Sequence, residues 1–592
     1  MIASRMQRAF VFEMLVLSGA LVSGCGEHAA KQPAQANASA LPPDENSYIR
    51  SREEGGYPDL SPPITVPAGS RAAEQTAQGA KPAPTVVASF DGLGSGFHGP
   101  QGSFFNPSPA DNSLAVGPDN IVQSVNVQMA IYTKKGKKFD TTGKVLLGPV
   151  DNNTVFHGFG GECEAHNGGD VVVRYDQLAN RWLITHGVRE KARPDAPKPW
   201  EPGAPAALSP PGRSGQPGPA APMYQPPPAP PPDTTAEPKH YSEPPANTVF
   251  GMCYAVSKTS DPLGPWYRYE FLRPFDPDYE RPAVWPDGYY NPSSTGDNRI
   301  SSTIVTQRHA CVAERAKMLN GLPATEQCFV VENVNFLNSV DLDGKTLPPA
   351  GAPNIIVADG GRQLDSIVVD SVLLTWQFHV DWKNPSKSTL KGPDTIRVAP
   401  YHYLCDGQLD NCVPQPNTRR GLDSQGDKLM QRTVYRNVKG HQSIVAVHSV
   451  NTSEKGGGVR WYELRVGTDG AVSLYQQGTY APDSNFRWMP SAAVDKLGNI
   501  GIGYSYGGPS VFVGQRFAGR QEGDPLGQLT LREAVLIDGQ AAQAATLRWT
   551  DYTQTAVDPS DDCTIWYVGN YMHQGARRYT SRIGAFRMPG CG

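Results

Sequence analysis

The sequence predicts an all-β protein built as a six- or seven-bladed β-propeller, with seven blades favoured. Short runs rich in Val, Ile, Tyr and Trp alternate with Gly, Asn, Asp and Pro along most of the 592 residues. The 61 glycines and 55 prolines supply many turns, and sustained helical periodicity is scarce. A strand–turn–strand pattern also recurs along the chain. Because a single hairpin cannot bury a face, repeated hairpins must stack.

The repeated unit is clearest in "SAAVDKLGNIGIGYSYG" (491–507) and "TAVDPSDDCTIWYVGNY" (555–571). Each has small residues, Ala-Val-Asp, a polar turn and then an alternating strand. Related runs begin near residues 113, 170, 281 and 442, and a weaker one spans 365–380. Intervals of roughly 45 to 110 residues fit four-stranded blades that carry insertions. We therefore expect each run to form the inner hairpin of one blade.

A resemblance rests on the runs "NSLAVGPDNIVQSVNVQMAIY" (112–132), "NFRWMPSAAVDKLGNIGIGYS" (485–505) and "DYTQTAVDPSDDCTIWYVGNY" (551–571). Over about 105–592 the chain resembles a broad group of secreted bacterial β-propeller proteins of uncharacterised activity. The resemblance implies a propeller fold and carries no established reaction with it. A Pro-rich insertion and an N-terminal tether depart from the pattern of the group.

The N-terminal residues predict a lipoprotein signal peptide over 1–24. Arg5 and Arg8 precede an apolar run, and "LVSGC" ends at Cys25, the expected lipidation site. An ordinary cleaved signal with a chance cysteine is the alternative. Gly26 in place of Asp indicates the bacterial outer membrane, facing the periplasm or the cell surface. Residues 25–85 are predicted to form a disordered tether, because they contain few large apolar groups.

The propeller itself is predicted over 86–592, interrupted by a Pro-rich loop at about 192–247. Of the 52 residues from Pro194 to Pro245, 19 are proline, a composition that cannot build a core. The insertion lies between two strand-like runs, "RWLITHGV" (181–188) and "VFGMCYAVS" (249–257). We therefore expect a long insertion in a hairpin loop, which surface loops tolerate at small entropic cost.

Cysteine usage predicts disulfides in an exported protein. Of the nine cysteines, lipidation of Cys25 leaves an even number for pairing. Sequence does not fix the connectivity, but nearness favours Cys405–Cys412 and Cys311–Cys328, with Cys563–Cys591 and Cys163–Cys253 as the remainder. No CxxC motif or Cys/His cluster occurs at ligand spacing, so no metal site is predicted.

The candidate site follows from the direction of the inner strands. In a propeller these strands run in one direction, so the residues that precede them meet at one end of the central channel. The predicted mouth consists of Asp111, Asn112, Asp170, Arg281, His441, Arg487, Trp488, Arg548, Trp549 and Asp551. The three arginines predict an anion-binding cluster and an acidic ligand. The alternative is that Arg/Asp pairs join the blades and the tryptophans pack between sheets.

The predicted function is that of a binding module at the cell envelope, with a glycan, a peptide or an envelope protein bound at the channel mouth. Membrane contact is expected through the lipid anchor only, and the net charge of -4 gives no bias toward nucleic acid. The alternatives are a glycoside hydrolase, sialidase-like or of another propeller type, that uses the mouth carboxylates, and an inert scaffold for partner proteins. Whether the protein is an enzyme stays open, and no catalytic residue is assigned.

No cofactor is predicted. The runs "DKLGN" (495–499) and "DPSDD" (558–562) are interpreted as hairpin turns, with structural calcium as the alternative.

Overall fold

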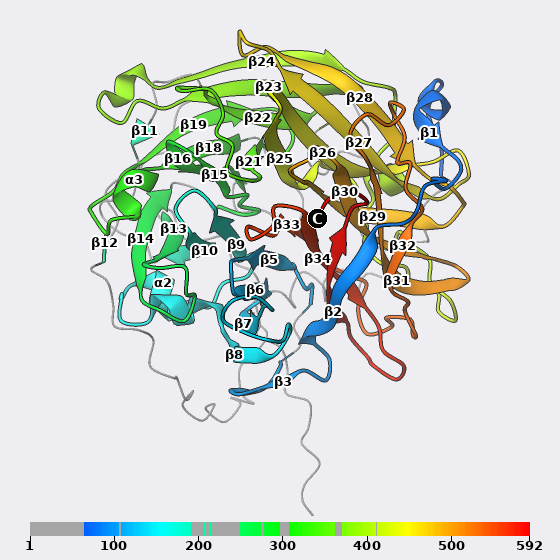
Figure 1. Ribbon diagram of the computed structural model, residues 1–592, viewed down its shortest axis with the longest axis horizontal. Coiled ribbons are helices and arrows are strands. Elements are labelled where there is room, and N and C mark those ends of the chain that lie inside the picture. Colours follow the sequence, from blue (N-terminus) through cyan, green and yellow to red (C-terminus); the bar gives the residue numbers. More distant parts are fainter. Residues whose placement is uncertain are drawn as a thin grey trace, which may run out of the picture.

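A computed structural model of the chain shows a ring of β-sheets (Figure 1). The structure describes residues 64–105, 108–190, 207–208, 214–215, 249–273, 277–295, 307–361, 370–409 and 411–592. The predicted signal peptide, the predicted lipidation site Cys25, residues 26–63 and most of the Pro-rich insertion lie outside these ranges. Within them, seven sheets contain four or more strands each. The prediction of an all-β propeller is confirmed, and the blade count is seven.

Blades 1 to 3 follow one another along the chain, each with its innermost strand first. Blade 1 contains β5 (Ser113–Val116), β6 (Asn120–Val125), β7 (Gln128–Thr133) and β8 (Val145–Asp151). Blade 2 contains β9 (Val172–Asp176), β10 (Arg181–Glu190), β13 (Val249–Ser257) and β14 (Trp266–Arg273). Blade 3 contains β15 (Ala283–Trp285), β16 (Gly288–Tyr290), β18 (Gln307–Ala313) and β19 (Glu326–Glu332), and β17 (Ser293–Thr295) also pairs with β18.

Blades 4 to 7 complete the ring. Blade 4 contains β20 (Asn338–Ser339), β22 (Asn354–Asp359), β23 (Val372–His379) and β24 (Thr389–Arg397). Blade 5 contains β25 (Met430–Val438), β26 (His441–Asn451), β27 (Gly457–Val466) and β28 (Val472–Tyr480), and β21 (Asp341–Leu342) lies parallel to β25 on its inner side. Blade 6 contains β29 (Phe486–Val494), β30 (Ile500–Gly508), β31 (Val511–Arg520) and β32 (Ala534–Ile537). Blade 7 contains β33 (Gln554–Val557), β34 (Thr564–Tyr571), β35 (Thr580–Arg587) and β2 (Thr85–Gly94).

Short helices and one small hairpin lie between the blade strands. They are η1 (Ser70–Ala73), η2 (Asn152–Phe156), α2 (Glu162–Ala165), α3 (Arg315–Met318), η3 (Pro385–Lys387), η4 (Leu404–Gly407), and the hairpin β3 (His98–Gly99) with β4 (Gly102–Ser103). Among the described residues, no helix has the length and apolar character needed to cross a membrane.

Five of the predicted inner hairpins are confirmed. The runs near 113, 170, 281, 491 and 555 form β5–β6, β9–β10, β15–β16, β29–β30 and β33–β34. Aspartate side chains hold the turns of β9–β10, β29–β30 and β33–β34. The Asp495 carboxylate, for example, accepts hydrogen bonds from the backbone N–H groups of Leu497 (2.9 Å) and Asn499 (3.0 Å). The interpretation of 495–499 and 558–562 as hairpin turns is therefore confirmed.

Two of the predicted inner hairpins were placed wrongly. The run near 442 is β26, the second strand of blade 5, because β25 precedes it in the sheet. The described part of the run 365–380 is β23, the third strand of blade 4. In both cases the inner strand has an irregular pattern. The pairing of β25 with β26 shifts register between Met430 and Val434, and β20 has only two residues.

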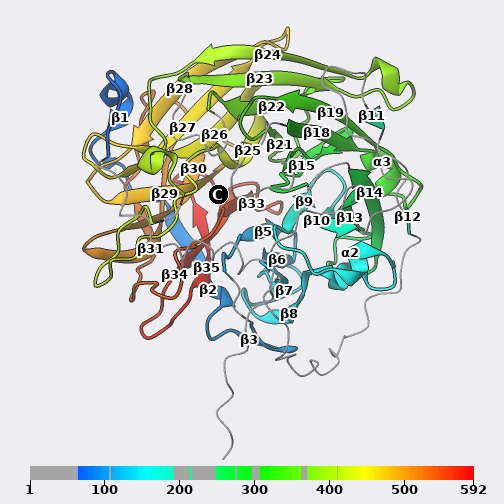
Figure 2. The same cartoon turned by 180° about the vertical axis from the view of Figure 1, so that it is seen from behind.

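Both ends of the described chain contribute to closure of the ring. Strand β2 pairs antiparallel with β35, so blade 7 combines an N-terminal strand with three C-terminal strands (Figures 1 and 2). Upstream, β1 (Glu74–Gln75) pairs parallel with β28 of blade 5, and the Glu74 carboxylate accepts a hydrogen bond from Ser453 N at 3.0 Å. The predicted tether therefore ends too late, because residues 64–85 already pack on the propeller.

The Pro-rich insertion connects two paired strands, as predicted. Strands β10 and β13 pair from Leu183–Val256 to Glu190–Val249. Two short pieces of the insertion also pair with outer strands. These are β11 (Ala207–Leu208), which pairs with β19 of blade 3, and β12 (Ser214–Gly215), which pairs with β14 of blade 2.

Replacing 192–247 with a short Asn-Gly turn is expected to lower the thermal midpoint by only a few degrees. The β10–β13 ladder stays intact, and among the described residues the deletion removes only the two-residue pairings of β11 and β12. Thermal unfolding followed by circular dichroism measures this. A loss larger than about 10 °C, several kcal/mol in a domain of this size, would show that the insertion stabilises blades 2 and 3 substantially.

All four disulfides match the predicted pairing, which consists of two pairs that nearness favoured and two that remained. They are Cys163–Cys253, Cys311–Cys328, Cys405–Cys412 and Cys563–Cys591. Disulfides persist in oxidising compartments. Four of them indicate an extracytoplasmic protein.

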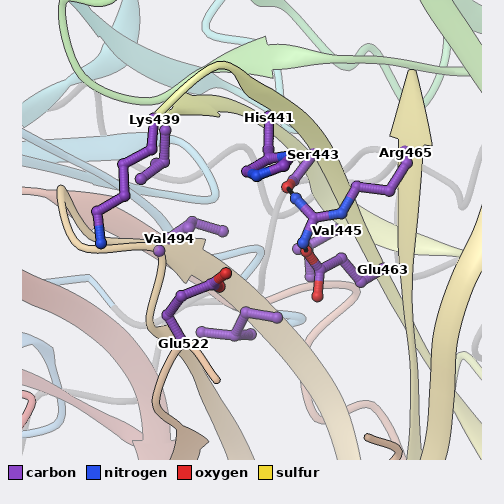
Figure 3. A pocket seen from close by; sticks show the side chains of 11 residues that line it. Lys439, His441, Ser443, Val445, Glu463, Arg465, Val494 and Glu522 are labelled. Carbon is purple, nitrogen blue, oxygen red and sulfur yellow. Dashed lines mark hydrogen bonds and ion pairs between the residues drawn. The ribbon is translucent and has the colours of Figure 1, made fainter. Parts of the chain in front are cut away.

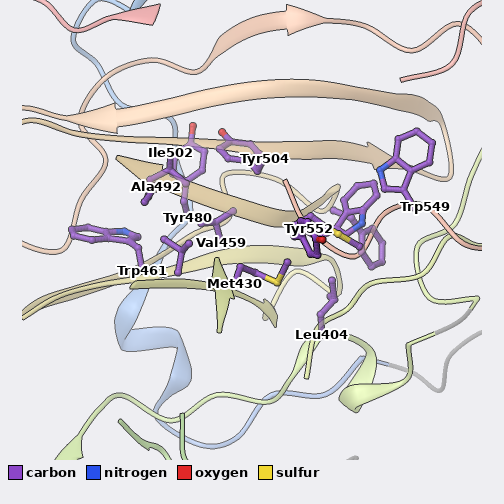
Figure 4. Packing of buried hydrophobic residues seen from close by; sticks show 14 of the residues in the cluster. Leu404, Met430, Val459, Trp461, Tyr480, Ala492, Ile502, Tyr504, Trp549 and Tyr552 are labelled. Carbon is purple, nitrogen blue, oxygen red and sulfur yellow. The ribbon is translucent and has the colours of Figure 1, made fainter. Parts of the chain in front are cut away.

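The largest hydrophobic cluster fills the space between blades 5 and 6 and reaches blade 7 (Figure 4). Val459 and Trp461 of β27 pack with Ile502 and Tyr504 of β30, all of them fully buried. Inter-blade packing of this kind fixes the position of each inner strand, and with it the residues at the ends of the channel.

Candidate functional site

The residues that precede several inner strands meet at one end of the channel, as the sequence predicted. The backbone N–H of Asp551, before β33, donates to Asp111 Oδ1 before β5 at 2.8 Å. The backbone N–H of Asp170, before β9, donates to Asn126 Oδ1 at 3.0 Å, and Asn126 Nδ2 in turn donates to Asp111 Oδ2. At the other ends of the strands, Lys496 N donates to Asp562 O at 2.8 Å and joins the turns of blades 6 and 7. We call the end where the inner strands begin the channel mouth.

Five carboxylates gather at the channel mouth, and we call them the acidic cluster. They are Asp111, Asp170, Asp278, Glu280 and Asp551. The side chains of Asp111, Glu280 and Asp551 are buried, whereas Asp170 and Asp278 are half-buried. Burial, together with the negative charge of the other four members, raises the pKa of Asp170 well above its ordinary value. The electrostatic surroundings of Asp170 therefore favour positive charge.

Two tyrosines border the acidic cluster. Tyr552 OH donates to Asp170 Oδ1 at 3.3 Å, and Tyr279 OH donates to Gln425 Oε1 at 3.1 Å. Their ring centroids lie 6.0 Å apart in an edge-to-face arrangement. Burial and the neighbouring carboxylates raise the pKa of both phenols, so both keep their protons at neutral pH.

Arg548 contacts the acidic cluster, and its charge is already paired. Its Nε donates to Asp423 Oδ2 at 3.0 Å, and its Nη2 donates to Asp551 Oδ1. Burial acts to lower the pKa of Arg548, but Asp551 and Asp423 raise it overall. Gln425 Nε2 donates to the same Asp551 oxygen at 3.1 Å. Asp551 is thereby fixed in place between Arg548 and Gln425.

The other two arginines do not form the predicted anion-binding cluster. Arg487 donates to Asp483 and Glu533 in and beside blade 6, and none of its partners belongs to the acidic cluster. The Arg281 guanidinium lies 5.0 Å from the centre of the Phe336 ring and donates to Leu429 O at 2.8 Å. Burial lowers the pKa of Arg281 to about 10. The prediction that the three arginines form one cluster was wrong.

Four further candidates lie elsewhere or have a structural role. Trp488 and Trp549 are fully buried in the cluster between the blades, so they form no aromatic funnel. Asn112 Nδ2 donates to Asn570 Oδ1 at 2.7 Å and joins blade 1 to blade 7. His441 follows the turn after β25 and lines a cavity with Gly498, at the opposite end of the channel. Its placement at the mouth was wrong because β25, and not β26, is the innermost strand.

The sequence also indicates the mouth residues that were not predicted. Asp278, Tyr279 and Glu280 precede β15 in the run "DYERP", from which only Arg281 was chosen. Tyr279 has a left-handed backbone (φ 55°), as do Asp111 (φ 47°) and Asp170 (φ 54°). Residues other than glycine in this conformation are uncommon and concentrate at functional sites.

Replacing Asp170 with Asn is expected to stabilise the protein at neutral pH. Because the folded state raises the pKa of Asp170, it binds this proton at pH values where the unfolded chain has lost it. The contribution of Asp170 to stability is therefore full below about pH 4 and falls as the pH rises through the raised pKa. Asn tolerates the left-handed backbone and still accepts the Tyr552 hydrogen bond.

We expect Asp170→Asn to gain about 0.5–2 kcal/mol at about pH 7, and to gain nothing below about pH 4. Denaturant unfolding at a series of pH values measures the difference. The exposed Asp394 of β24 offers a matched control, because Asp394→Asn makes the same chemical change away from other carboxylates. A gain that does not vary with pH would contradict the electrostatic account of Asp170.

Comparisons with known proteins assign no family to this chain. No protein-family model and no curated protein sequence matches this chain. Among solved structures, the chain is similar to a protein of unknown function from Dyadobacter fermentans (10% identity, TM-score 0.31, 86% of this chain and 100% of that one). It is also similar to the WD40 domain of SCAP from fission yeast (8%, 0.33, 84% and 98%) and to an ulvan lyase of polysaccharide lyase family PL25 (10%, 0.33, 81% and 91%). At such identities and scores these proteins identify neither a ligand nor a reaction for this chain.

Proposed function

We propose that this protein is a binding module of the bacterial cell envelope that takes up a basic side chain of a peptide ligand at the channel mouth. The observation that carries the proposal is the position of Asp170, half-buried among four other carboxylates. A ligand cation placed beside Asp170 would relieve the repulsion that raises its pKa, so binding and ionisation of Asp170 would favour each other.

The tyrosines support an arginine or lysine side chain over a metal ion. Tyr279 and Tyr552 place aromatic rings next to carboxylates, a combination that suits a cation with an apolar stem. The left-handed backbone of Asp111, Asp170 and Tyr279 is a further support, because such conformations persist where the surrounding structure holds functional groups in place.

Titration calorimetry with blocked tri-arginine tests the proposal. Wild type should bind tri-arginine and not tri-glutamate, and Asp278→Asn should weaken binding by at least about tenfold, because it removes a charge-assisted contact. Binding should also weaken in high salt. Asp394→Asn is the control for the loss of a remote carboxylate. Equal binding of the two peptides, or unchanged affinity in Asp278→Asn, would overturn the proposal.

A second candidate, glycoside hydrolysis, is favoured by the contrast between two carboxyl groups. Asp170 has a raised pKa, as a general acid requires, whereas Asp551 forms an ion pair with Arg548 and would serve as the base or nucleophile. If the channel mouth is a glycosidase site, purified protein should release sugar from aryl glycosides, and Asp551→Asn should abolish the release. Turnover that persists in Asp551→Asn would reject this assignment.

Attachment to the envelope is part of the same proposal. The disulfides support an extracytoplasmic location, and the sequence "LVSGC" supports lipidation of Cys25. Cys25→Ser should move the protein from the membrane fraction to the soluble fraction without a change in its thermal midpoint. Continued association with the membrane would contradict lipid anchoring.

A further inference from the structure

A segment of chain between blades 4 and 5 forms one wall of the channel mouth, and we call its residues 421–428 the mouth strap. The strap ends just before β25, the inner strand of blade 5. Gln425, near its centre, is buried. Its Nε2 donates to Asp551 Oδ1 at 3.1 Å, and its Oε1 accepts from Tyr279 OH at 3.1 Å and from Lys428 Nζ at 2.6 Å. Gln425 therefore joins the chain that enters blade 7 to the chain that enters blade 3.

The backbone of Gln425 needs support from outside the strap. It is left-handed (φ 43°), a conformation that is uncommon in residues other than glycine and persists where the surrounding structure holds it. Ser424 N donates to Leu409 O at 2.8 Å, and an added Cβ on Gly426 would come within 2.7 Å of Leu404 Cβ. Leu404 itself belongs to the buried cluster between the blades (Figure 4). The strap therefore packs against the segment that begins with η4.

The Cys405–Cys412 disulfide ties this segment to blade 5 and to the strap. Cys405 N donates to Asn451 Oδ1 of β26 at 2.8 Å, and Cys412 N donates to Leu422 O of the strap at 2.9 Å. The disulfide thus connects a residue held on blade 5 with one held on the strap, three positions before Gln425. Its two cysteines are 7 residues apart in the sequence, the shortest separation of the four disulfides. By loop-closure entropy it therefore contributes the least of the four to global stability.

We propose that Gln425 is a positioning residue of the channel mouth and that the Cys405–Cys412 disulfide holds it in place. This inference rests on the proposed binding of a basic side chain at the mouth. Gln425 fixes Asp551 and Tyr279, and so keeps the groups around Asp170 in the arrangement that receives the ligand cation. The disulfide acts on binding through the strap, although it does not touch the ligand.

A second disulfide supplies a matched control at the opposite end of the channel. Cys563 follows the 558–562 turn of blade 7, and Cys591 lies 28 residues further along the chain. At that end, the hollow beside His441 and Glu522 (Figure 3) has room for about one water molecule, so it does not accommodate a peptide side chain. Because Cys563–Cys591 closes the longer loop, its loss should lower the thermal midpoint more than the loss of Cys405–Cys412.

Titration calorimetry with blocked tri-arginine compares two double variants under conditions where both are folded. Cys405→Ser combined with Cys412→Ser should weaken binding by at least about tenfold, while the thermal midpoint falls by only a few degrees. Cys563→Ser combined with Cys591→Ser should bind like wild type, although its midpoint falls further. Unchanged affinity in the first variant, or an equal loss of affinity in both, would overturn the proposal.

Gln425→Met tests the positioning residue itself, because methionine keeps the length of the side chain and removes its three hydrogen bonds. It should weaken tri-arginine binding by at least about tenfold. Gln327→Met is the control and should bind like wild type. Gln327 is also buried, but it accepts from Ser388 Oγ at 2.7 Å and donates to Asp381 O at 3.2 Å beside β19, the outer strand of blade 3. Wild-type affinity in Gln425→Met would overturn the assignment.

Hydrogen exchange follows the strap without any ligand, so it separates this inference from the proposed function. The N–H groups of Leu422 and Ser424 donate to Val413 O and Leu409 O, both at 2.8 Å. In the variant without Cys405–Cys412 they should exchange at least about tenfold faster, whereas exchange in β29 should not change. Faster exchange together with no tri-arginine binding by wild type would reject the proposed function and support the hold of the disulfide on the strap. Unchanged exchange would overturn the inference.

Discussion

Arg487→Ala is expected to destabilise the protein by about 3 kcal/mol, because it removes the hydrogen-bonded cation of the buried Glu533 carboxylate and leaves only Arg516, 3.8 Å away. Arg487 is fully buried, and its Nε donates to Glu533 Oε2 at 2.9 Å. Glu533 is itself 7% exposed and also accepts a hydrogen bond from Tyr504 OH at 2.6 Å. The second partner of Arg487, Asp483, is 39% exposed and can be solvated again at small cost.

Denaturant unfolding measures this loss, and an exposed ion pair provides the control. Arg397 is 84% exposed and lies 4.0 Å from Asp370, so Arg397→Ala should change stability by less than about 1 kcal/mol. Binding of tri-arginine at the channel mouth should be unchanged in Arg487→Ala under conditions where the variant is folded. If Arg487→Ala unfolded like wild type and lost an acidic ligand, the anion site predicted from the sequence would be correct after all.

Removal of β2 is expected to have the other large effect, because this strand closes the ring. A chain that begins at residue 64 keeps every blade strand, whereas one that begins at 96 lacks the outer strand of blade 7. The lost strand includes Leu93, which is fully buried and whose N–H donates to Gln123 Oε1 of blade 1 at 2.9 Å. Its removal exposes the edge of β35 and uncovers the joint between blades 7 and 1.

We expect the chain that begins at 96 to lose more than about 10 °C in its thermal midpoint, or to lose its cooperative transition. The chain that begins at 64 should unfold like the mature protein. Thermal scans of the three proteins at one concentration make the comparison. Equal midpoints for the chains that begin at 64 and 96 would show that β2 does not close the ring.

The sequence predicted the blades well where the inner hairpin is regular. In "SAAVDKLGNIGIGYS" the alternation of β29 and β30 and the Asp495 turn are local features, so they can be read directly. The same approach failed for blade 5, because the irregular pairing between Met430 and Val434 breaks the alternation of β25. Because of this error, His441 was predicted at the wrong end of the channel. Gln425, which precedes the true inner strand, was not predicted at the mouth.

The composition of the mouth was harder to predict than its position. Their positions just before predicted inner strands placed Asp111, Asp170 and Asp551 together, and these residues share one hydrogen-bonded network. Sequence positions do not show which charges pair, because Asp483 and Glu533 reach Arg487 through the packing of blade 6. The sequence therefore predicted an anion-binding cluster of arginines at the mouth, whereas the structure has a cluster of carboxylates there.

The most direct test of the acidic mouth is the number of protons released when a cation binds. A ligand cation beside Asp170 must drive that carboxyl group to ionise, since burial and four other carboxylates raise its pKa in the free protein. Titration calorimetry in buffers with different ionisation enthalpies counts these protons. With blocked tri-arginine we predict net proton release from wild type between about pH 5 and 8, and none from Asp170→Asn. Binding without proton release, or equal release from the two proteins, would contradict the account.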